Sequence, residues 1–141
     1  MIARRTFLRV SAGTFTAGVL APLTGCGGVP MLVRHAPAGR FSITLTEYRA
    51  TAGDESAIAV DVGSGWPVLV GEREDGSFFA LSSKCTHQAC RVRPTGGALV
   101  CPCHGSAFDR EGSVLRGPAQ RSLAAYTATV RDAAVHVELG Q

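Results

Sequence analysis

The chain has 141 residues, of which 45% are hydrophobic and 18% are charged, and this composition fits one compact domain. The formal charge is +3, but three of the fourteen basic residues lie within the first ten positions, and removal of residues 1–25 would leave eleven basic and eleven acidic residues. A chain that is neutral in this way lacks the basic excess of a nucleic-acid-binding protein, so that class of function is excluded.

The N-terminal segment resembles an export signal. The paired arginines Arg4 and Arg5, followed by Phe-Leu-Arg, resemble the twin-arginine motif of bacterial export signals. The apolar run from Val10 to Leu23 is shorter than the ~20 residues that span a bilayer, and glycine and proline interrupt it. We therefore expect residues 1–25 to be a signal peptide, with an uncleaved anchor or a buried helix as the alternatives.

The sequence Leu-Thr-Gly-Cys at residues 23–26 resembles a lipobox, the motif at which bacterial lipoproteins are acylated and cleaved. Acylation of Cys26 would hold the protein stably on the periplasmic side of a bacterial membrane, because lipoproteins carry more than one acyl chain. The alternative is a chance cysteine among small residues. Glycine and proline punctuate residues 26–40, which we expect to be a flexible tether. The apolar residues 31–33 leave open that this segment packs on the domain.

Seven segments after residue 40 are predicted to be β-strands from their composition, their alternation or the turn signals beside them. We expect a polar turn over residues 71–76 and no helix of useful length, so the prediction for residues 41–141 is an all-β domain, an antiparallel sandwich or small barrel. His136 falls on the polar face of the last segment, and we interpret it as a surface residue. The predicted strands are Phe41 to Thr46, Ile58 to Val62, Trp66 to Val70, Phe78 to Leu81, Ala98 to Val100, Leu123 to Val130 and Val135 to Leu139.

Two short segments hold four of the five cysteines and two of the four histidines. Residues 85–90 (box one) read C-T-H-Q-A-C, and residues 101–106 (box two) read C-P-C-H-G-S. Thiolate sulfur and imidazole nitrogen are ligands for zinc, copper and iron–sulfur sites. A zinc ion held by two cysteines and two histidines is one alternative, but it would leave one cysteine in each box unexplained.

Both boxes resemble the Rieske iron–sulfur family, in particular the disulfide-bearing branch of cytochrome bc complexes, which carries C-T-H-x-x-C and C-P-C-H-G-S. The resemblance implies one 2Fe–2S cluster held by two cysteines and two histidines. It places Cys85 and Cys101 on one iron and His87 and His104 on the other, and it pairs Cys90 with Cys103. It also implies a Rieske-type base of antiparallel sheets with a small cluster-binding subdomain.

The resemblance extends to residues that would surround the cluster. Ser106 can donate a hydrogen bond to a cluster sulfur, whereas Phe108 stands where high-potential relatives have tyrosine and cannot donate one. We therefore expect a midpoint potential below that of typical quinol-oxidising relatives. The run Gly112-x-Val114-x-x-Gly117-Pro118-Ala119 resembles the third loop of the family, which covers the cluster, although the usual proline after it is Gln120 here.

These features predict an exported, membrane-tethered Rieske protein that passes single electrons between redox partner proteins and is not a stand-alone enzyme. Alternatives are the iron–sulfur subunit of a quinol-oxidising cytochrome bc-type complex or of a periplasmic molybdenum oxidoreductase. A structural zinc-binding module is an alternative of a different class. Basic residues near the boxes could steer an acidic redox partner; they are Lys84, Arg91, Arg93, Arg110 and Arg116.

Overall fold

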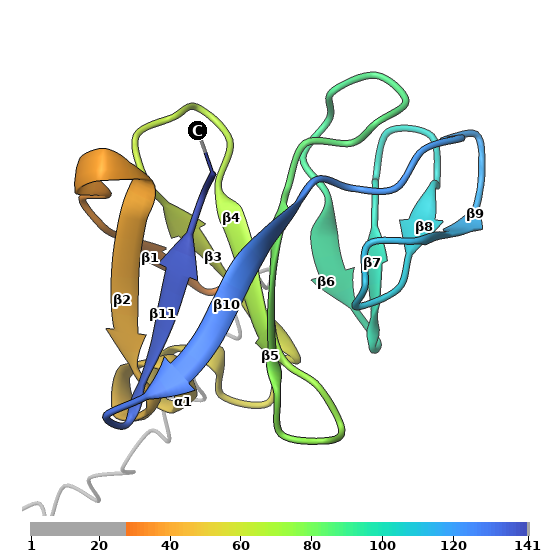
Figure 1. Ribbon diagram of the computed structural model, residues 1–141. Coiled ribbons are helices and arrows are strands. Elements are labelled where there is room, and N and C mark those ends of the chain that lie inside the picture. The colour runs from red at the N-terminus through yellow and green to blue at the C-terminus, as the bar shows by residue number, and fades with distance from the viewer. Residues whose placement is uncertain (1–27, 141) are drawn as a thin grey trace, which may run out of the picture.

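The computed structural model describes residues 28–140, which form a seven-stranded sheet and a four-stranded sheet (Figure 1). The predicted signal peptide and Cys26 lie outside the described residues. The strand order is β1-β3-β4-β5-β10-β11-β2 in the large sheet and β6-β7-β8-β9 in the small one. The elements are β1 Met31–Val33, η1 Pro37–Gly39, β2 Arg40–Thr44, α1 Leu45–Ala52, β3 Ala57–Asp61, β4 Val68–Glu72, β5 Phe78–Ser82, β6 Arg93–Thr95, β7 Ala98–Val100, β8 Ala107–Phe108, β9 Val114–Arg116, β10 Ala125–Arg131 and β11 Ala134–Glu138.

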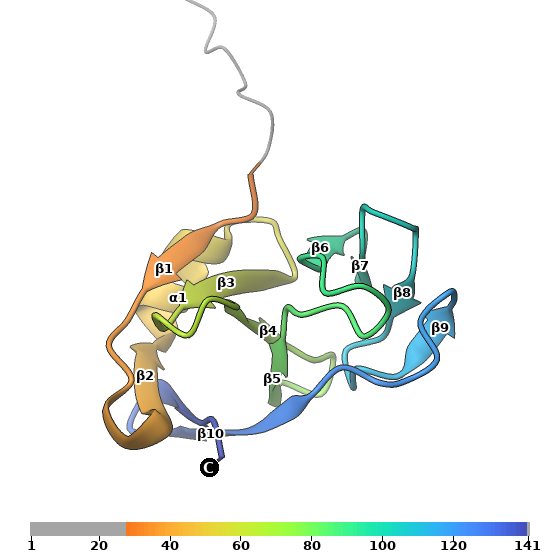
Figure 2. The same cartoon turned by 90° about the horizontal axis from the view of Figure 1, so that it is seen from above.

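The large sheet curls around its own interior, as the view from above shows (Figure 2). Its neighbouring strands are antiparallel, except that β1 pairs parallel to β3. The small sheet is antiparallel throughout and lies beside β5. The prediction of an all-β fold with an antiparallel base and a small second subdomain is confirmed. No helix among the described residues is long and apolar enough to cross a membrane.

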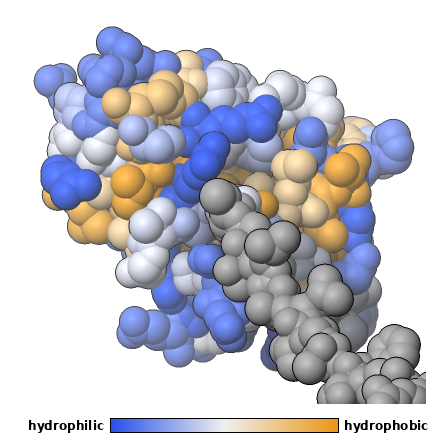
Figure 3. All heavy atoms as spheres, turned by 180° about the vertical axis from the view of Figure 1, so that it is seen from behind, coloured by the Kyte–Doolittle hydropathy of each residue, from blue (hydrophilic) through white to orange (hydrophobic). Residues whose placement is uncertain are grey.

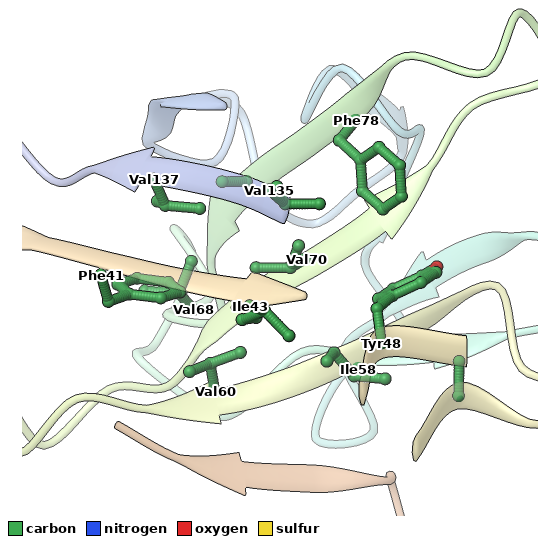
Figure 4. Close-up of a cluster of buried hydrophobic side chains, with 12 residues drawn as sticks. Phe41, Ile43, Tyr48, Ile58, Val60, Val68, Val70, Phe78, Val135 and Val137 are labelled. Carbon is green, nitrogen blue, oxygen red and sulfur yellow. The ribbon is translucent and has the colours of Figure 1, made fainter. Parts of the chain in front are cut away.

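The strands β3, β4 and β5 are buried on both faces. Alternate side chains such as Ile58, Val70 and Phe78 point into the interior of the curled sheet (Figure 4). The residues between them, such as Leu69 and Phe79, pack in a second cluster against the small subdomain. The alternation of apolar and polar residues around Ile58 is typical of a strand with one buried face, but here the small subdomain covers the second face as well.

The segment predicted to be a flexible tether is part of the folded domain from residue 28 onwards. Met31, Leu32 and Val33 pair with residues 59–61 of β3, and the Ala59 amide donates to the Pro30 carbonyl over 2.8 Å. The alternative that residues 31–33 pack on the domain is therefore the correct one. Because β1 is an edge strand, Met31 and Val33 remain 54% and 69% exposed, and hydrophobic areas appear on the face where the described chain begins (Figure 3).

Helix α1 was not expected, and its start explains why the first predicted strand is too long. Thr44 is the N-cap: its hydroxyl accepts the amide of Glu47 over 3.1 Å, while the Glu47 carboxylate accepts the amide of Thr44 over 3.2 Å. This reciprocal capping box ends β2 and places Leu45 in the helix. The signal T-x-x-E was present in the sequence, and it outweighs the strand alternation at this point.

Two further expectations need correction. Residues 71 and 72 were predicted to lie in a turn but belong to β4, where a Cβ on Gly71 would lie 2.6 Å from the Ser56 carbonyl oxygen and closer still to the Phe79 ring. Glycine is required there by the close approach of the neighbouring chain. His136 is half-buried, and its Nε2 atom is enclosed without a hydrogen-bond partner among the described residues, so it is not a plain surface residue.

Candidate metal centre

The two boxes fold into loops with the same backbone design. In box one the amide of Cys85 donates to the carbonyl of Cys90, and the amide of Ala89 donates to the carbonyl of Cys85, both over 2.9 Å. Box two repeats the pattern: Cys101 donates to Ser106 over 2.8 Å, and Gly105 donates to Cys101 over 2.9 Å. Each loop therefore turns tightly around its first cysteine, at the end of the small subdomain away from the turn between β8 and β9.

The fifth residue of each loop adopts the left-handed conformation that closes the turn. Gly105 has φ +76° at this position, where glycine carries no steric cost. Ala89 has φ 54° at the matching position of box one, where a side chain costs about 1–2 kcal/mol. Box one is thus held in a mildly strained turn by its surroundings, including the Thr86 hydroxyl, which donates to the Arg121 carbonyl over 2.6 Å.

A disulfide joins the two loops. Cys90 and Cys103 are bonded, with Cα atoms 6.4 Å apart, as the resemblance implies. The sulfur of Cys101 lies within 4.8 Å of both bridge sulfurs. Although these three sulfurs form a compact group, the two in the bridge are not free thiolates, so the candidate ligand among them is Cys101.

The remaining four side chains divide into an inner and an outer pair. The thiols of Cys85 and Cys101 are free and only 2% and 1% exposed. The rings of His87 and His104 are exposed, with centroids 4.9 Å apart and planes at 89°. Two sulfur donors beneath two nitrogen donors match the mixed donor set of a 2Fe–2S cluster with histidine on one iron.

The surroundings of the Cys101 thiol disfavour its negatively charged form. Burial raises the pKa of the Cys101 thiol most strongly; the Cys103 amide lowers it by a smaller amount, and the neighbouring Cys85 thiol raises it again. A thiolate at Cys101 would lose hydration in this buried position, so the thiol resists ionisation. A bound metal removes this difficulty, since a coordinating thiol is deprotonated by the cation itself.

Ser106 links box two to the third loop. The Ser106 side chain is fully buried, and its hydroxyl oxygen accepts the Ala119 amide over 3.0 Å. Since that bond uses a lone pair, the hydroxyl proton stays available for a sulfur acceptor. Gly117 and Pro118 are exposed and joined by a cis peptide, immediately before the buried Ala119. The third loop therefore reaches box two through Ala119, the last residue of the predicted run.

Phe108 lies in β8, is completely buried, and belongs to the cluster of apolar side chains that also contains Cys85 and Cys101. A phenyl ring in this place packs well but offers no hydrogen-bond donor. Phe108 thus belongs to the same buried cluster as the inner cysteines, where a side chain can affect the midpoint potential of the centre.

Sequence reasoning missed Arg121 and included Arg110 among the basic residues near the boxes. A hollow of about 460 Å³ lies beside His87, and both Lys84 and Arg121 line it. Arg110 instead donates to the Glu72 carbonyl over 3.3 Å, on the base sheet. Arg121 is far from box one in the sequence, but the chain folds back beside it. There the Arg121 carbonyl accepts a hydrogen bond from the Thr86 hydroxyl.

The sequence profile of the Rieske [2Fe-2S] domain family matches residues 47–127. The cytochrome b6-f complex iron-sulfur subunit of Prochlorococcus marinus (strain AS9601) is 41% identical over 100 residues, which cover 68% of this chain and 56% of the relative. The corresponding subunit of Gloeobacter violaceus is 31% identical over 118 residues, which cover 80% of this chain and 63% of the relative. The chain thus spans little more than half the length of these curated relatives.

Solved structures agree with this assignment. The cyanobacterial plasma membrane Rieske protein PetC3 from Synechocystis PCC 6803 is 31% identical, with a TM-score of 0.59, and the match covers 70% of this chain and 98% of that one. A Sphingomonas yanoikuyae B1 ferredoxin matches with a TM-score of 0.55 at 24% identity over 70% of this chain and 97% of that one, a level that shows the fold alone. With both boxes inside the matched segment and the fold in agreement, the chain belongs to the Rieske [2Fe-2S] family.

Proposed function

We propose that Cys85 and Cys101 ligate the inner iron of the cluster and that His87 and His104 ligate the outer iron. As a Rieske protein the chain holds a 2Fe–2S cluster, which supplies a one-electron redox couple. The observation that carries the assignment is the separation of two buried thiols from two exposed imidazoles. The disulfide removes Cys90 and Cys103 from the ligand set.

In this arrangement the chain's own residues decide where electrons enter and leave. The exposed rings of His87 and His104 provide the short route to a partner at the surface. The inner side is closed by buried apolar residues, including Leu99 and Phe108, which exclude water. We therefore propose a carrier that exchanges single electrons with redox partner proteins through the two histidines.

We further propose that the protein is exported by the twin-arginine route and held by a lipid on Cys26 at the periplasmic side of a bacterial membrane. The motif at residues 3–9 and the lipobox at residues 23–26 support this proposal. The Cys90–Cys103 disulfide supports it independently, because such bonds persist in oxidising compartments.

Purified protein tests the ligand assignment. We expect about two irons and two acid-labile sulfides per chain and an electron paramagnetic resonance (EPR) signal after reduction, as a 2Fe–2S centre requires. His87→Ala and His104→Ala should each abolish that signal, while His136→Ala, which changes a histidine outside the boxes, should retain it. A colourless protein that binds zinc would refute the proposal in favour of a zinc module.

Cell fractionation tests the export proposal. The native protein should be found in the membrane fraction and incorporate radiolabelled palmitate, and Cys26→Ala should lose both properties while keeping its cluster. Arg4→Lys together with Arg5→Lys should leave the protein in the cytoplasm. Unchanged location and labelling of these variants would show that neither motif operates.

A second candidate is an iron–sulfur subunit of a cytochrome complex, because the curated relatives are cytochrome b6-f complex iron-sulfur subunits. Phe108 and the exposed Gln88 favour the carrier, since neither provides the hydrogen bond or the apolar cover expected of a high-potential quinol oxidant. Mild-detergent purification from the native membrane separates the two candidates: stable association with a cytochrome b would favour the subunit.

A further inference from the structure

We propose that the tip of the protein docks on an acidic face of a redox partner protein, with His87 and His104 at the centre of the contact. The tip is defined here as residues 84–108 and 113–124, which contain both boxes and the third loop. This inference rests on the proposed exit of electrons through the two histidines and adds the chemistry of the surface that receives them.

Charge is divided sharply between the tip and the rest of the described chain. The tip holds five basic residues and no acidic residue, whereas the remainder of residues 28–140 holds six basic and eleven acidic residues. The formal charges are therefore +5 and −5, in a molecule whose described part is neutral. The basic residues of the tip are Lys84, Arg91, Arg93, Arg116 and Arg121, and all five are exposed.

The folded structure sets three of these charges near the histidine loops, whereas Arg91 and Arg93 line a separate hollow beside β1. Lys84 and Arg121 line the same hollow as His87, although they are far apart in the sequence. Arg116 lies against the other loop, where its Nε donates to the Gly105 carbonyl over 2.9 Å, next to His104. Each histidine thus has a basic neighbour fixed beside it.

The acidic turn that precedes β9 points away from the histidines. Glu111 forms an ion pair with Arg73 of the base over 3.0 Å. The Asp109 carboxylate accepts the amides of Glu111 and Ser113 within its own turn. Box two precedes β8 and this turn follows β8, so the turn lies at the other end of the strand. Its carboxylates therefore do not neutralise the tip.

The tip cations have no carboxylate partner within the described residues, whereas Arg34, Arg40 and Arg73 of the base are each paired with a glutamate. Lys84 and Arg91 even face each other across an isolated antiparallel bridge. Like charges directly opposite on paired strands are destabilising. Both side chains contact uncharged groups instead of carboxylates. The Lys84 ammonium lies 5.7 Å from the centre of the Trp66 ring, and the Arg91 guanidinium donates to the Gly65 carbonyl.

A surface of this kind suits a partner with carboxylates around its own redox centre. Opposite charges raise the rate of encounter by factors of about 10 to 1,000 at low salt. The negative base adds orientation, because an acidic partner is attracted to the tip and repelled by the other end. The hollow beside His87 offers hydroxyl and amide groups, on Thr86, Gln88 and Ser122, that can bind carboxylates or water at a protein contact.

Stopped-flow kinetics tests the proposal with two protein oxidants, an acidic blue-copper protein and a basic c-type cytochrome of similar potential. The reduced protein should react faster with the acidic oxidant, and that rate should fall at least several-fold between about 10 mM and about 500 mM salt, as the Debye length shrinks from ~30 Å to under ~5 Å. Lys84→Glu and Arg121→Glu should each slow the reaction several-fold at low salt and converge with the native protein at high salt.

Arg131→Glu is the matched control, because it makes the same charge change at the far end of β10. It should leave the rate with the acidic oxidant nearly unchanged. A faster reaction with the basic cytochrome, a salt-independent rate, or an equal effect of Arg131→Glu and Arg121→Glu would overturn the proposal. Two further measurements distinguish failure of this proposal from failure of the proposed function. The rate of reaction with an uncharged small oxidant and the EPR signal should be the same in every variant as in the native protein.

Discussion

Replacement of both bridge cysteines in the variant Cys90→Ala/Cys103→Ala should weaken the tip far more than the base. The bridge spans 13 positions, and loop-closure entropy for a loop of that size corresponds to about 3 kcal/mol of unfolding free energy at 25 °C. Within the described residues, the backbone hydrogen bonds of each box stay inside that box. The bridge is therefore the direct link between the two loops that carry the ligands.

Guanidinium titration checks this prediction with two signals, visible absorption for the cluster and far-ultraviolet circular dichroism for the sheets. In the native protein the two transitions should coincide. In the double variant, cluster loss should shift to lower denaturant by about 1 M, given the usual dependence of unfolding free energy on guanidinium, while the sheet transition should shift less. The variant Cys26→Ala serves as control, because it removes a cysteine outside both boxes.

Coincident transitions in the double variant, at the midpoint of the native protein, would refute the reasoning. Such a result would mean that the cluster ligands alone hold the two loops together. An equal shift of both signals would show instead that the bridge stabilises the whole domain and not the tip.

Four further predictions follow from single side chains. Phe108→Tyr should raise the midpoint potential in a redox titration, and an unchanged potential would show that no hydrogen bond to the centre is missing. Ser106→Ala should lower the potential and destabilise the protein by about 1–3 kcal/mol, because the buried Ala119 amide loses its acceptor; a thermal melt that matches the native one would contradict this. Ala89→Gly should raise the unfolding free energy by about 1 kcal/mol, because glycine relieves the left-handed strain, and a decrease would show that the alanine methyl matters more. The Thr44 amide and then Arg34 lower the pKa of Glu47, so its contribution to stability is present above its ordinary pKa and is lost as the pH falls through the lower folded value. Glu47→Gln should therefore be less stable than the native protein near neutrality and equal to it at strongly acid pH, and a difference that persists in acid would point to another role.

A metal centre could be proposed from the sequence because the information for it is local. Ligand types and their spacing within each box depend on a few adjacent residues, and box two supplies its serine in the same stretch. The Cys90–Cys103 bridge also followed from the resemblance of the boxes, and the structure contains it. Phe108 could be singled out for the same reason, since its place two residues after Ser106 is part of the pattern.

Some local information was present but pointed two ways. The alternation from Phe41 to Leu45 indicates a strand, while Thr44 and Glu47 indicate a helix start, and the capping hydrogen bonds prevail once Tyr48 and Ala52 can be buried. At Gly71 the turn signal of glycine was misleading, because the residue is glycine to admit the Phe79 ring.

The resemblance of the two boxes predicted the donor set and the cross-linking cysteines, and the alternation of side chains indicated the β character of this protein. Only the tertiary structure decided that β3 to β5 are buried on both faces, that residues 31–33 join the sheet, and that Arg121 stands beside His87. The physical reason is that coordination and turn chemistry act over a few bonds along the chain. Burial and charge neighbourhoods instead depend on which distant segments the fold brings together.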